Sequence, residues 1–405
     1  QAQERLPCGR PCATPYTGTT HFREHPMVLI APLIHVLILA LTAPRATALV
    51  LTSDAHYGTE EYRQAVAAQI EKAMAQLRLA GPDAALAPGG GGNCAQGKLL
   101  PEFYVLGAMN TATTSLWLDL HSSGAMPAPG TSPLKEWHFF QQLSCTPVST
   151  QWALWEQSLL DCPATPAVMG DFSVSNLYTI PMPSDLAWSQ LRFPDKAICP
   201  ENFHTPELIQ QFHAKLGGTT PRFVVLFREP LARLQSEFYH TLPWGTCTGC
   251  RVNSTFADSL AANVALLQHQ PPLMSDWFWK SFYARHVEEY LRHFDARQFF
   301  FVPDREYFAI NPPNFSASIL GWLNMQSRPW MEASHGNVHP KKPLLNEELP
   351  PGAPARAAYE AFMEPEKERL VRTLAEAQLQ GSVLAGYEGA PGDAAAVGRW
   401  LARGW

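Results

Sequence analysis

A short turn that begins at Gly107 and is rich in small and hydroxyl residues, 107–116, has the composition of a phosphate-binding loop. It follows an apolar run, 103–106, that predicts a buried strand, and residues 115–118 are expected to begin a helix. The first N–H groups of a helix have no partner within it and carry the positive end of its dipole, so they bind phosphate. Thr113 and Thr114 add hydroxyl donors at the same point. The segment therefore predicts a strand, a phosphate loop and a helix.

A second segment, residues 222–240, repeats this design. The apolar run 223–227 predicts a strand, Arg228 stands at its end, and Pro230 suits the first turn of a helix. Arg228 offers a rigid fork of donors to a phosphate, and Ser236 can reach the same anion from the helix. Two anion sites, each at the carboxyl end of a buried strand, predict a ligand with phosphates at both ends.

Together these segments resemble the two nucleotide signatures of sulfotransferases that use 3′-phosphoadenosine 5′-phosphosulfate (PAPS), especially the Golgi carbohydrate enzymes of the heparan sulfate type. The family's first loop, G-x-x-K-x-G-T-T-x-L, binds the 5′-phosphosulfate. The resemblance gives that role to Gly107, Ala108, Met109, Asn110, Thr111, Ala112, Thr113, Thr114 and Ser115. The second signature, R-x-P-x-x-R-x-x-S-x-x-Y, binds the 3′-phosphate and is matched by Arg228, Pro230, Arg233, Ser236 and Tyr239. The likeness extends from about Leu99 to about Leu374.

A third stretch resembles the family's K-E-x-x-F-F segment. It contains Lys135, Glu136, His138, Phe139 and Phe140. The resemblance implies that Glu136 is the catalytic base, which takes a proton from the acceptor as that group attacks. Burial among aromatic rings favours a neutral carboxyl group, whereas an adjacent lysine favours the charged form. His138 is the alternative base, although a single histidine among aromatic residues is more often part of a core. Without the resemblance, a surface Lys-Glu pair is the ordinary interpretation.

Two residues of the first loop depart from the family pattern. Asn110 stands where the family has lysine or arginine, and Ala112 stands where it has glycine. The lysine neutralises charge that grows as the sulfuryl group leaves, whereas asparagine donates a hydrogen bond without charge. Residues 334–345 resemble a late basic loop that closes over PAPS in relatives, so Lys341 or Lys342 is a candidate for the missing cation, with a pair of solvated lysines as the alternative.

Three functions follow from these motifs. The first is a PAPS-dependent sulfotransferase that needs no metal ion and acts on a hydroxyl or amine, most simply of a carbohydrate. The second is a sulfotransferase-like protein that binds nucleotide or glycan with little or no turnover, because Asn110 lacks the charge. A P-loop kinase is disfavoured, since Gly-Lys-Ser/Thr and an evident Mg-binding aspartate are absent. Residues 171–175 lack the lysine that relatives carry in an E-K-[ST]-P stretch. The resemblance therefore says little about the class of the acceptor substrate.

The elements that must position these residues predict an α/β fold. We expect a P-loop-like central sheet, mostly parallel and flanked by helices, with the ligand at the carboxyl edge of the strands. The chain of 405 residues, 46% hydrophobic, is long enough for one large domain or two modest ones. Its net charge of -6 gives no general attraction to nucleic acid, so a polyanionic substrate would need a local basic patch.

The expected organisation places the sulfotransferase-like domain at residues 99–380. Before it lie an unassigned upstream segment at 1–26, a signal peptide or signal anchor at 27–48, and a stem with a Gly/Pro-rich linker at 49–98. Within the last of these, 59–80 predicts an amphipathic helix, as a stem or as the first helix of the domain. Within the domain we expect a strand near 167–169, one helix from 274 that runs into a strand at 298–302, and a final helix at 353–380; disorder or loose packing is expected in the tail, 381–405.

Either targeting segment predicts the secretory pathway, as a Golgi lumenal type II membrane protein or a secreted one. Asn253 and Asn314 begin glycosylation sequons, which agree with this route. Cys247 and Cys250 are spaced to close a small disulfide loop, with a zinc site as the poorer alternative.

Overall fold

The structure is a computed structural model. The residues it describes are 94–95, 98–122, 126, 135–136, 140, 161–162, 168–178, 205–216, 220–241, 254–269, 276–305, 318–325 and 343–405. Several predictions concern residues outside these ranges: the targeting segment 27–48, the amphipathic helix 59–80, both sequon asparagines and the Cys247–Cys250 loop. No helix within the described ranges has the length and hydrophobicity that a membrane crossing requires.

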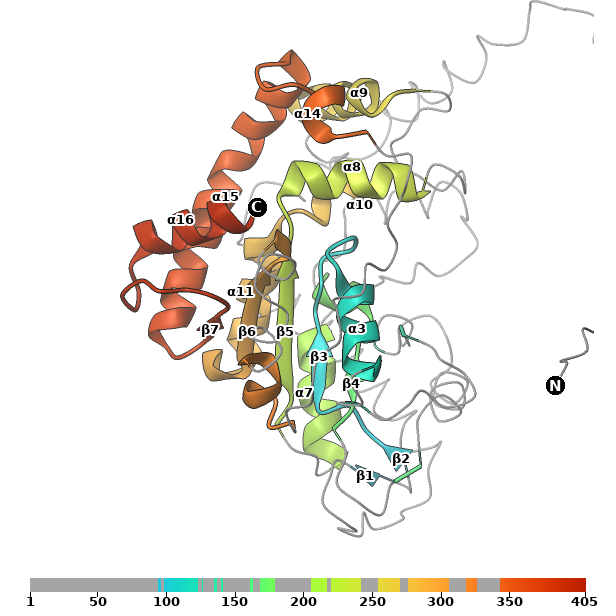
Figure 1. Ribbon diagram of the computed structural model, residues 1–405, viewed down its shortest axis with the longest axis vertical. Coiled ribbons are helices and arrows are strands. Elements are labelled where there is room, and N and C mark those ends of the chain that lie inside the picture. Colours follow the sequence, from blue (N-terminus) through green and yellow to red (C-terminus); the bar gives the residue numbers. More distant parts are fainter. Residues whose placement is uncertain are drawn as a thin grey trace, which may run out of the picture. The chain divides into compact units, whose positions relative to one another are not determined.

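A five-stranded sheet forms the centre of the fold, as the sequence predicts (Figure 1). Every neighbouring pair in it is parallel. In spatial order the strands are β4 (Gly170–Asp171), β3 (Phe103–Val105), β5 (Arg222–Phe227), β6 (Phe299–Pro303) and β7 (Val383–Leu384). The residues of β3 and β6 are all buried, which is the reason that these strands are continuous apolar runs.

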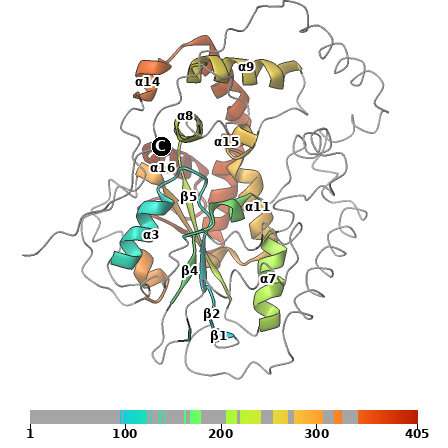
Figure 2. The same cartoon turned by 90° about the vertical axis from the view of Figure 1, so that its right-hand side faces the viewer.

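Helices cover both faces of this sheet (Figure 2). Helix α3 (Thr113–Ser122) packs on one face through Leu116 and Leu120, together with the helical residues 318–322. The other face carries α7 (Thr205–Leu216), which the sequence analysis did not predict, and α11 (Tyr283–His293). Tyr104 and Phe223 from the strands meet Tyr290 of α11 in this second core. The strand side chains therefore alternate between two separate apolar layers.

A third group of helices lies beyond the carboxyl end of the sheet. It contains α8 (Pro230–Thr241), α9 (Phe256–His269), α10 (Asp276–Trp279) and α14 (Leu345–Glu348). The long helix α15 (Pro354–Leu379) reaches from this group to the face that carries α11. The predictions of a strand at 223–227, a helix from Pro230 and a helix at 353–380 are confirmed within one or two residues.

The expectation of a disordered or loosely packed tail is wrong. Residues 381–405 form β7, which pairs with β6, and α16 (Ala394–Gly404). Trp400 of α16 is 1% exposed, and its indole N–H donates to the carbonyl of Ala385 at 2.7 Å. Each element is short and the two are separated by a turn with three glycines, so neither produces a long periodic pattern.

Two further expectations need correction. The segment expected to be a stem and Gly/Pro-rich linker, 49–98, contains strand β1 (Cys94–Ala95), which pairs antiparallel with β2 (Lys98–Leu99). The single helix from 274 is interrupted between α10 and α11: the N–H of Ser281 bonds to Phe278 and not to Trp277, four residues back. The Trp277 carbonyl instead accepts a hydrogen bond from Arg233. A contact with a distant helix thus ends α10, which local periodicity does not reveal.

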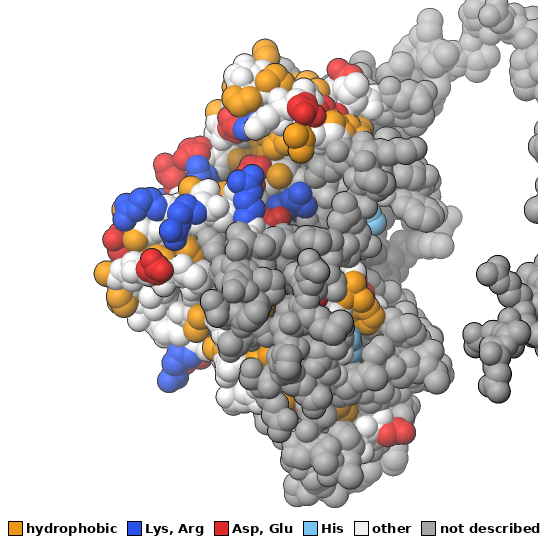
Figure 3. All heavy atoms as spheres, viewed as in Figure 1, with side chains coloured by type: hydrophobic (Ala, Val, Ile, Leu, Met, Phe, Trp, Pro, Cys, Tyr) orange, Lys and Arg blue, Asp and Glu red, His pale blue; other side chains and the backbone are white. Residues whose placement is uncertain are grey.

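The surface of α15 and α16 carries side chains of both charges (Figure 3). Several of them form exposed ion pairs along α15, such as Arg372 with Glu368 and Lys367 with Glu364. Such pairs contribute little to stability, because water and salt screen both partners.

A methyl group at Gly170 is expected to destabilise the sheet. A Cβ atom there would lie 2.2 Å from the Phe103 ring on the neighbouring strand. Gly170→Ala should lower the free energy of unfolding by about 1–3 kcal/mol, measured by urea denaturation. Gly321→Ala is the control: its Cβ would meet nothing within 4 Å, and its position in a helix should make the change neutral or stabilising by up to about 1 kcal/mol. Equal effects of the two substitutions would contradict this account of Gly170.

Candidate functional site

The two sequence motifs meet at one edge of the sheet. Strands β3 and β5 are neighbours and run parallel, with Val105 opposite Val224. The loop after β3 continues this pairing, because the Ala108 N–H donates to the Leu226 carbonyl at 3.2 Å. Arg228, at the end of β5, donates from Nη1 to the carbonyl of Asn110 at 3.0 Å. The guanidinium of the second motif is therefore bonded to the backbone of the first.

The candidate phosphate loop, residues 107–112, turns through two residues in the left-handed region. Asn110 has a φ of 68° and Ala112 a φ of 60°. Asparagine adopts this conformation readily, whereas alanine is strained there, so the glycine of the family pattern at position 112 has a conformational explanation. Helix α3 starts directly afterwards at Thr113, two residues before the predicted start at Ser115. Both threonine hydroxyls thus belong to the first helical turn.

Gly107 lets the loop pack onto the start of α3. A Cβ atom at this position would lie 2.0 Å from Cγ2 of Thr113. The loop is closed on itself by Thr111, whose hydroxyl donates to the carbonyl of Ala108 at 2.5 Å. This packing fixes the direction in which the first N–H groups of α3 point.

The third motif lies beside the same helix start. The Lys135 ammonium group donates to the hydroxyl of Thr113 at 3.0 Å and to the carboxylate of Glu136 at 2.6 Å. The side chains of Lys135 and Glu136 are 15% and 27% exposed, so both reach the surface of the site. Lys135 therefore links the candidate base to the phosphate loop. His138 lies outside the described residues.

Tyr178 supports the loop from the other side and was missed by the sequence analysis. The N–H of Met109 donates to its hydroxyl oxygen at 2.7 Å. Burial raises the pKa of Tyr178 to about 12, so the hydroxyl stays neutral. Tyr178 is held by a short 3-10 turn, Val174–Leu177, that follows β4. The Asp171 carboxylate closes that turn by accepting hydrogen bonds from Ser173, which gives the stretch 171–175 a structural role.

Arg228 is balanced by a carboxylate from the next strand. Its Nε lies 3.4 Å from Oδ2 of Asp304, directly after β6. Burial raises the pKa of Asp304 to about 6, while the nearby Arg228 opposes the rise. The hydroxyl of Tyr283 donates to the carbonyl of Arg228 at 3.1 Å and fixes the backbone at this point. Ser236 lies partly exposed on the second turn of α8.

The start of α8 differs from the start of α3. The Glu229 carboxylate accepts hydrogen bonds from the N–H groups of Leu231 at 3.0 Å and Ala232 at 2.6 Å. The second motif thus repeats the strand, turn and helix but caps its helix with its own carboxylate. An anion at this end would be held by the side chains of Arg228 and Ser236 and not by helix N–H groups.

Tyr239 of the second signature and Gln235, which precedes Ser236, both contact α14. The Tyr239 hydroxyl donates to the carboxylate of Glu348 on α14 at 2.6 Å. Gln235 donates to the same carboxylate at 2.8 Å and to the carbonyl of Pro343 at 3.3 Å. Lys341 and Lys342 are not among the described residues. The first described residue after them, Pro343, is therefore tied to the neighbour of Ser236.

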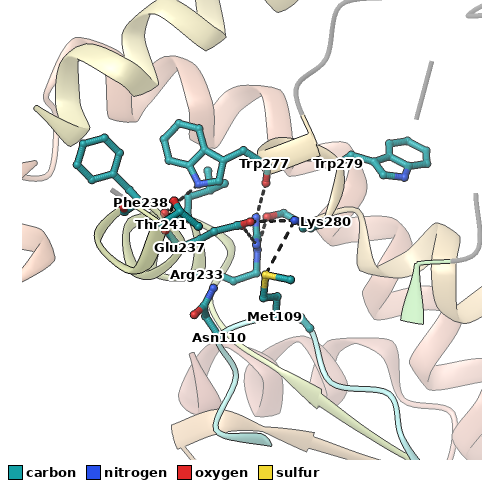
Figure 4. Close-up of polar contacts among 12 residues, drawn as sticks. Met109, Asn110, Arg233, Glu237, Phe238, Thr241, Trp277, Trp279 and Lys280 are labelled. Atoms are coloured by element: carbon teal, nitrogen blue, oxygen red, sulfur yellow. Dashed lines mark hydrogen bonds and ion pairs between the residues drawn. The ribbon is translucent and has the colours of Figure 1, made fainter. Parts of the chain in front are cut away.

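Arg233 is the centre of a buried ionic cluster (Figure 4). Its side chain is fully buried and donates to Glu237 at 2.5 Å, to the Ser281 hydroxyl at 2.9 Å and to the Trp277 carbonyl. Burial alone would lower the pKa of Arg233, but the Glu237 carboxylate raises it above its ordinary value. Lys280 donates to the other oxygen of Glu237 at 2.9 Å. These two cations hold the pKa of Glu237 below its ordinary value in spite of its burial.

The loop contains a donor that fits an anionic ligand. The side-chain nitrogen of Asn110 is buried and finds no hydrogen-bond partner among the described residues. A buried donor without an acceptor costs about 1–3 kcal/mol, which a ligand oxygen would recover. Asn110 lies in the loop and Thr113 begins the helix that follows it. This combination of an amide donor, a hydroxyl and a helix start suits a phosphate or sulfate group.

Comparisons with known proteins give a similarity of fold to solved structures. No protein-family model matches the chain, and no curated protein does. Among solved structures, the chain is similar to the crystal structure of a sulfotransferase from Alicyclobacillus acidocaldarius, at 18% sequence identity and a TM-score of 0.42. The match covers 67% of this chain and 94% of that chain. A likeness at this level leaves the function to be inferred from the geometry of the site itself.

Removal of Arg233 is expected to be costly, because the buried Glu237 carboxylate keeps only Lys280 as a cationic partner and the Trp277 carbonyl loses its donor. Arg233→Met should lower the free energy of unfolding by about 3–5 kcal/mol. Arg372→Met is a matched control, since Arg233–Glu237 and Arg372–Glu368 both join residues four apart on a helix, but with side chains 0%/7% and 66%/62% exposed. The control should lose about 0.5 kcal/mol or less. Similar losses in chemical denaturation would refute a special role for the buried cluster.

Asp304 is expected to make stability depend on pH. Because its pKa of about 6 exceeds the ordinary value of 3.8, the folded protein binds this proton more tightly than the unfolded chain. That contribution favours folding at low pH and is lost as the pH rises from about 4 to about 6. The stability of wild type relative to Asp304→Asn, which cannot titrate, should therefore fall over this window, by at most about 3 kcal/mol. A difference that stays constant in denaturation series across this window would contradict the assignment.

Proposed function

We propose that the chain binds PAPS across the carboxyl ends of β3 and β5 and transfers its sulfuryl group to an acceptor hydroxyl or amine. The observation that carries this proposal is the hydrogen bond from Arg228 to the Asn110 carbonyl. It holds two candidate anion sites at adjacent strand ends, which suits a nucleotide with a phosphate at each end. The five-stranded parallel sheet supports the proposal, because open parallel sheets bind ligands at this edge.

The residues of the site divide into two groups under this proposal. The 5′ end of the nucleotide is bound by the loop 107–112, by the Asn110 amide group and by the first turn of α3 with Thr113. The 3′-phosphate is bound by Arg228, whose fork matches phosphate geometry, and by Ser236. The ion pair between Arg228 and Asp304 is 3.4 Å long and the Arg228 side chain is 25% exposed, so this side chain remains accessible to an anion.

Glu136 is the proposed base. As the acceptor atom forms its bond to sulfur, the bond between sulfur and the 5′-phosphate oxygen breaks, and the acceptor proton moves to a Glu136 carboxylate oxygen. Lys135 orients this carboxylate and joins it to Thr113, so the proton acceptor is set relative to the phosphate loop. The bound PAPS supplies only the sulfuryl group and the nucleotide leaving group.

A second function follows from one residue. Asn110 brings no charge to the loop where a departing phosphate would develop one, and a lost charge at such a point costs orders of magnitude in rate. The alternative is therefore a protein that binds the nucleotide or a glycan without turnover.

We also propose a carbohydrate acceptor and a place in the secretory pathway. The motif resemblance to Golgi carbohydrate enzymes supports the acceptor class. The apolar segment at 28–41 and the two sequons support the compartment.

Nucleotide binding and turnover test these functions separately. Wild type should bind 3′-phosphoadenosine 5′-phosphate (PAP) in calorimetry. It should also transfer the radioactive sulfuryl group of labelled PAPS to at least one member of a panel of glycans. Glu136→Gln should retain PAP binding and lose at least about a hundredfold in transfer rate. Glu360→Gln, on exposed α15, serves as the control and should change neither.

Each outcome selects one function. Absence of PAP binding would refute the proposal as a whole. Binding without transfer in wild type, together with transfer in Asn110→Lys, would establish the nucleotide binder instead.

A further inference from the structure

The hydroxyl group of Tyr178 uses only one of its two hydrogen-bonding functions. A phenol oxygen can accept a hydrogen bond while its O–H group donates another. The N–H of Met109 takes the acceptor position, at 2.7 Å. In the part of the chain that the structure describes, the Tyr178 O–H group meets no acceptor, although Tyr178 is only 4% exposed. A buried donor is therefore left over beside the loop 107–112.

A second buried donor without an acceptor belongs to the next residue of the loop. Asn110 follows Met109, and its side-chain nitrogen is likewise unpaired within the described ranges. Because an unpaired buried donor costs about 1–3 kcal/mol, a ligand oxygen at this point would recover that cost. A phosphate group suits both donors, since it carries several acceptor oxygens on one centre.

The position of the Tyr178 hydroxyl is fixed by the buried turn that precedes it. The Asp171 carboxylate accepts hydrogen bonds from the N–H of Ser173 at 2.8 Å and from the side-chain nitrogen of Asn176 at 3.1 Å. Residues 171–178 are all buried. The Tyr178 ring lies edge to face with His286 of α11, with the ring centres 5.4 Å apart. The hydroxyl is thus held in place before a ligand arrives, which is what an effective donor requires.

The hydroxyl keeps its proton over the physiological pH range. Burial raises the pKa of Tyr178 to about 12, and the nearby Arg233 and Lys280 cations oppose that rise. A neutral hydroxyl can accept and donate at the same time, and the bond that it accepts from Met109 polarises its own O–H group.

We propose that the Tyr178 hydroxyl donates a hydrogen bond to an oxygen of the 5′-phosphate or 5′-phosphosulfate group while it accepts the N–H of Met109. This inference rests on the proposed function. Tyr178 is then a ligand-binding residue, supplied by the segment after β4 and not by either nucleotide motif. Together with the Asn110 amide group it gives the 5′ end of the nucleotide two neutral donors.

The first test compares two nucleotides that differ at one end. The contribution of the 5′-phosphate is the ratio of the affinities for PAP and for adenosine 3′-monophosphate, measured by calorimetry or by competition. Tyr178→Phe should lower this ratio about ten- to hundredfold, as expected for a lost hydrogen bond to a charged group. The preference for PAP over adenosine 5′-monophosphate, which reports the 3′-phosphate, should stay near its wild-type value.

A matched control is the removal of a hydroxyl elsewhere. The Tyr387 hydroxyl donates to the carbonyl of Ala390 at 2.9 Å, in the turn after the edge strand β7. Tyr387→Phe should change neither ratio.

A fluorinated tyrosine separates donation to the ligand from support of the loop, since Tyr178→Phe removes both. Ring fluorine withdraws electrons, so Tyr178→3,5-difluorotyrosine keeps the hydroxyl but has a lower phenol pKa. If the hydroxyl donates to the ligand, the 5′-phosphate ratio of this variant should fall as its phenol ionises, because a phenolate has no proton to donate. Wild type should keep its ratio over the same range. The series runs above about pH 7, where the phosphate groups are already ionised.

A role in support of the loop alone predicts the opposite trend. A phenolate accepts the N–H of Met109 more strongly than a phenol does, so the ratio would then be kept or would rise with pH. That result would overturn the inference even if Tyr178→Phe lowers the ratio.

The remaining outcomes are also distinguishable. If wild type binds PAP and folded Tyr178→Phe keeps the wild-type ratio, the inference about Tyr178 is overturned and the proposed function stands. If wild type does not bind PAP, the proposed function and this inference both fail. Melting temperatures show whether Tyr178→Phe folds; if it does not, the fluorinated variant, which retains the hydroxyl, decides the question.

Discussion

The burial of the Arg233 guanidinium group determines how the helices beyond the carboxyl end of the sheet are arranged. A fully buried arginine has five N–H donors that must all find acceptors, and water is excluded from doing so. Each of the three guanidinium nitrogens of Arg233 has an acceptor: a carboxylate on its own helix, a hydroxyl and a backbone carbonyl. The carbonyl is available only because α10 ends before Ser281. The orientation of α10 and α11 relative to α8 thus follows from one side chain.

The arrangement of the loops at the sheet depends on a different constraint, the parallel register of β3 and β5. Because parallel neighbours end at the same edge, any loops that follow them are brought together. Here the pairing continues one step past the strands, through the N–H of Ala108, and delivers Asn110 to Arg228. The sheet and the helices beyond it meet at Met109, which contacts Tyr178 with its backbone and Lys280 with its side chain. The loop is therefore shaped by the sheet and contacted by the helices.

The sequence predicts the local parts of this design well. The strands around 103–106 and 223–227, the helix from Pro230 and the meeting of three motifs follow from apolar runs, turn residues and signatures. What it does not predict depends on contacts between distant segments. The break at 280–282 is caused by Arg233, and Tyr178 reaches the loop from a segment without a motif. Short elements such as β7 and α16 also lack the length that makes a period visible.

The last strand of the sheet has a consequence for the synthesis of the protein. Among the described residues, strand β6 pairs on its outer side with β7, and Trp400 of α16 bonds to the carbonyl of Ala385, which follows β7. While a ribosome is still making the stretch up to α16, the nascent polypeptide presents an open and wholly apolar edge strand, Phe299–Pro303. Such an edge pairs readily with other chains. Until β7 is synthesised and docked, this edge of the sheet is therefore open to such pairing.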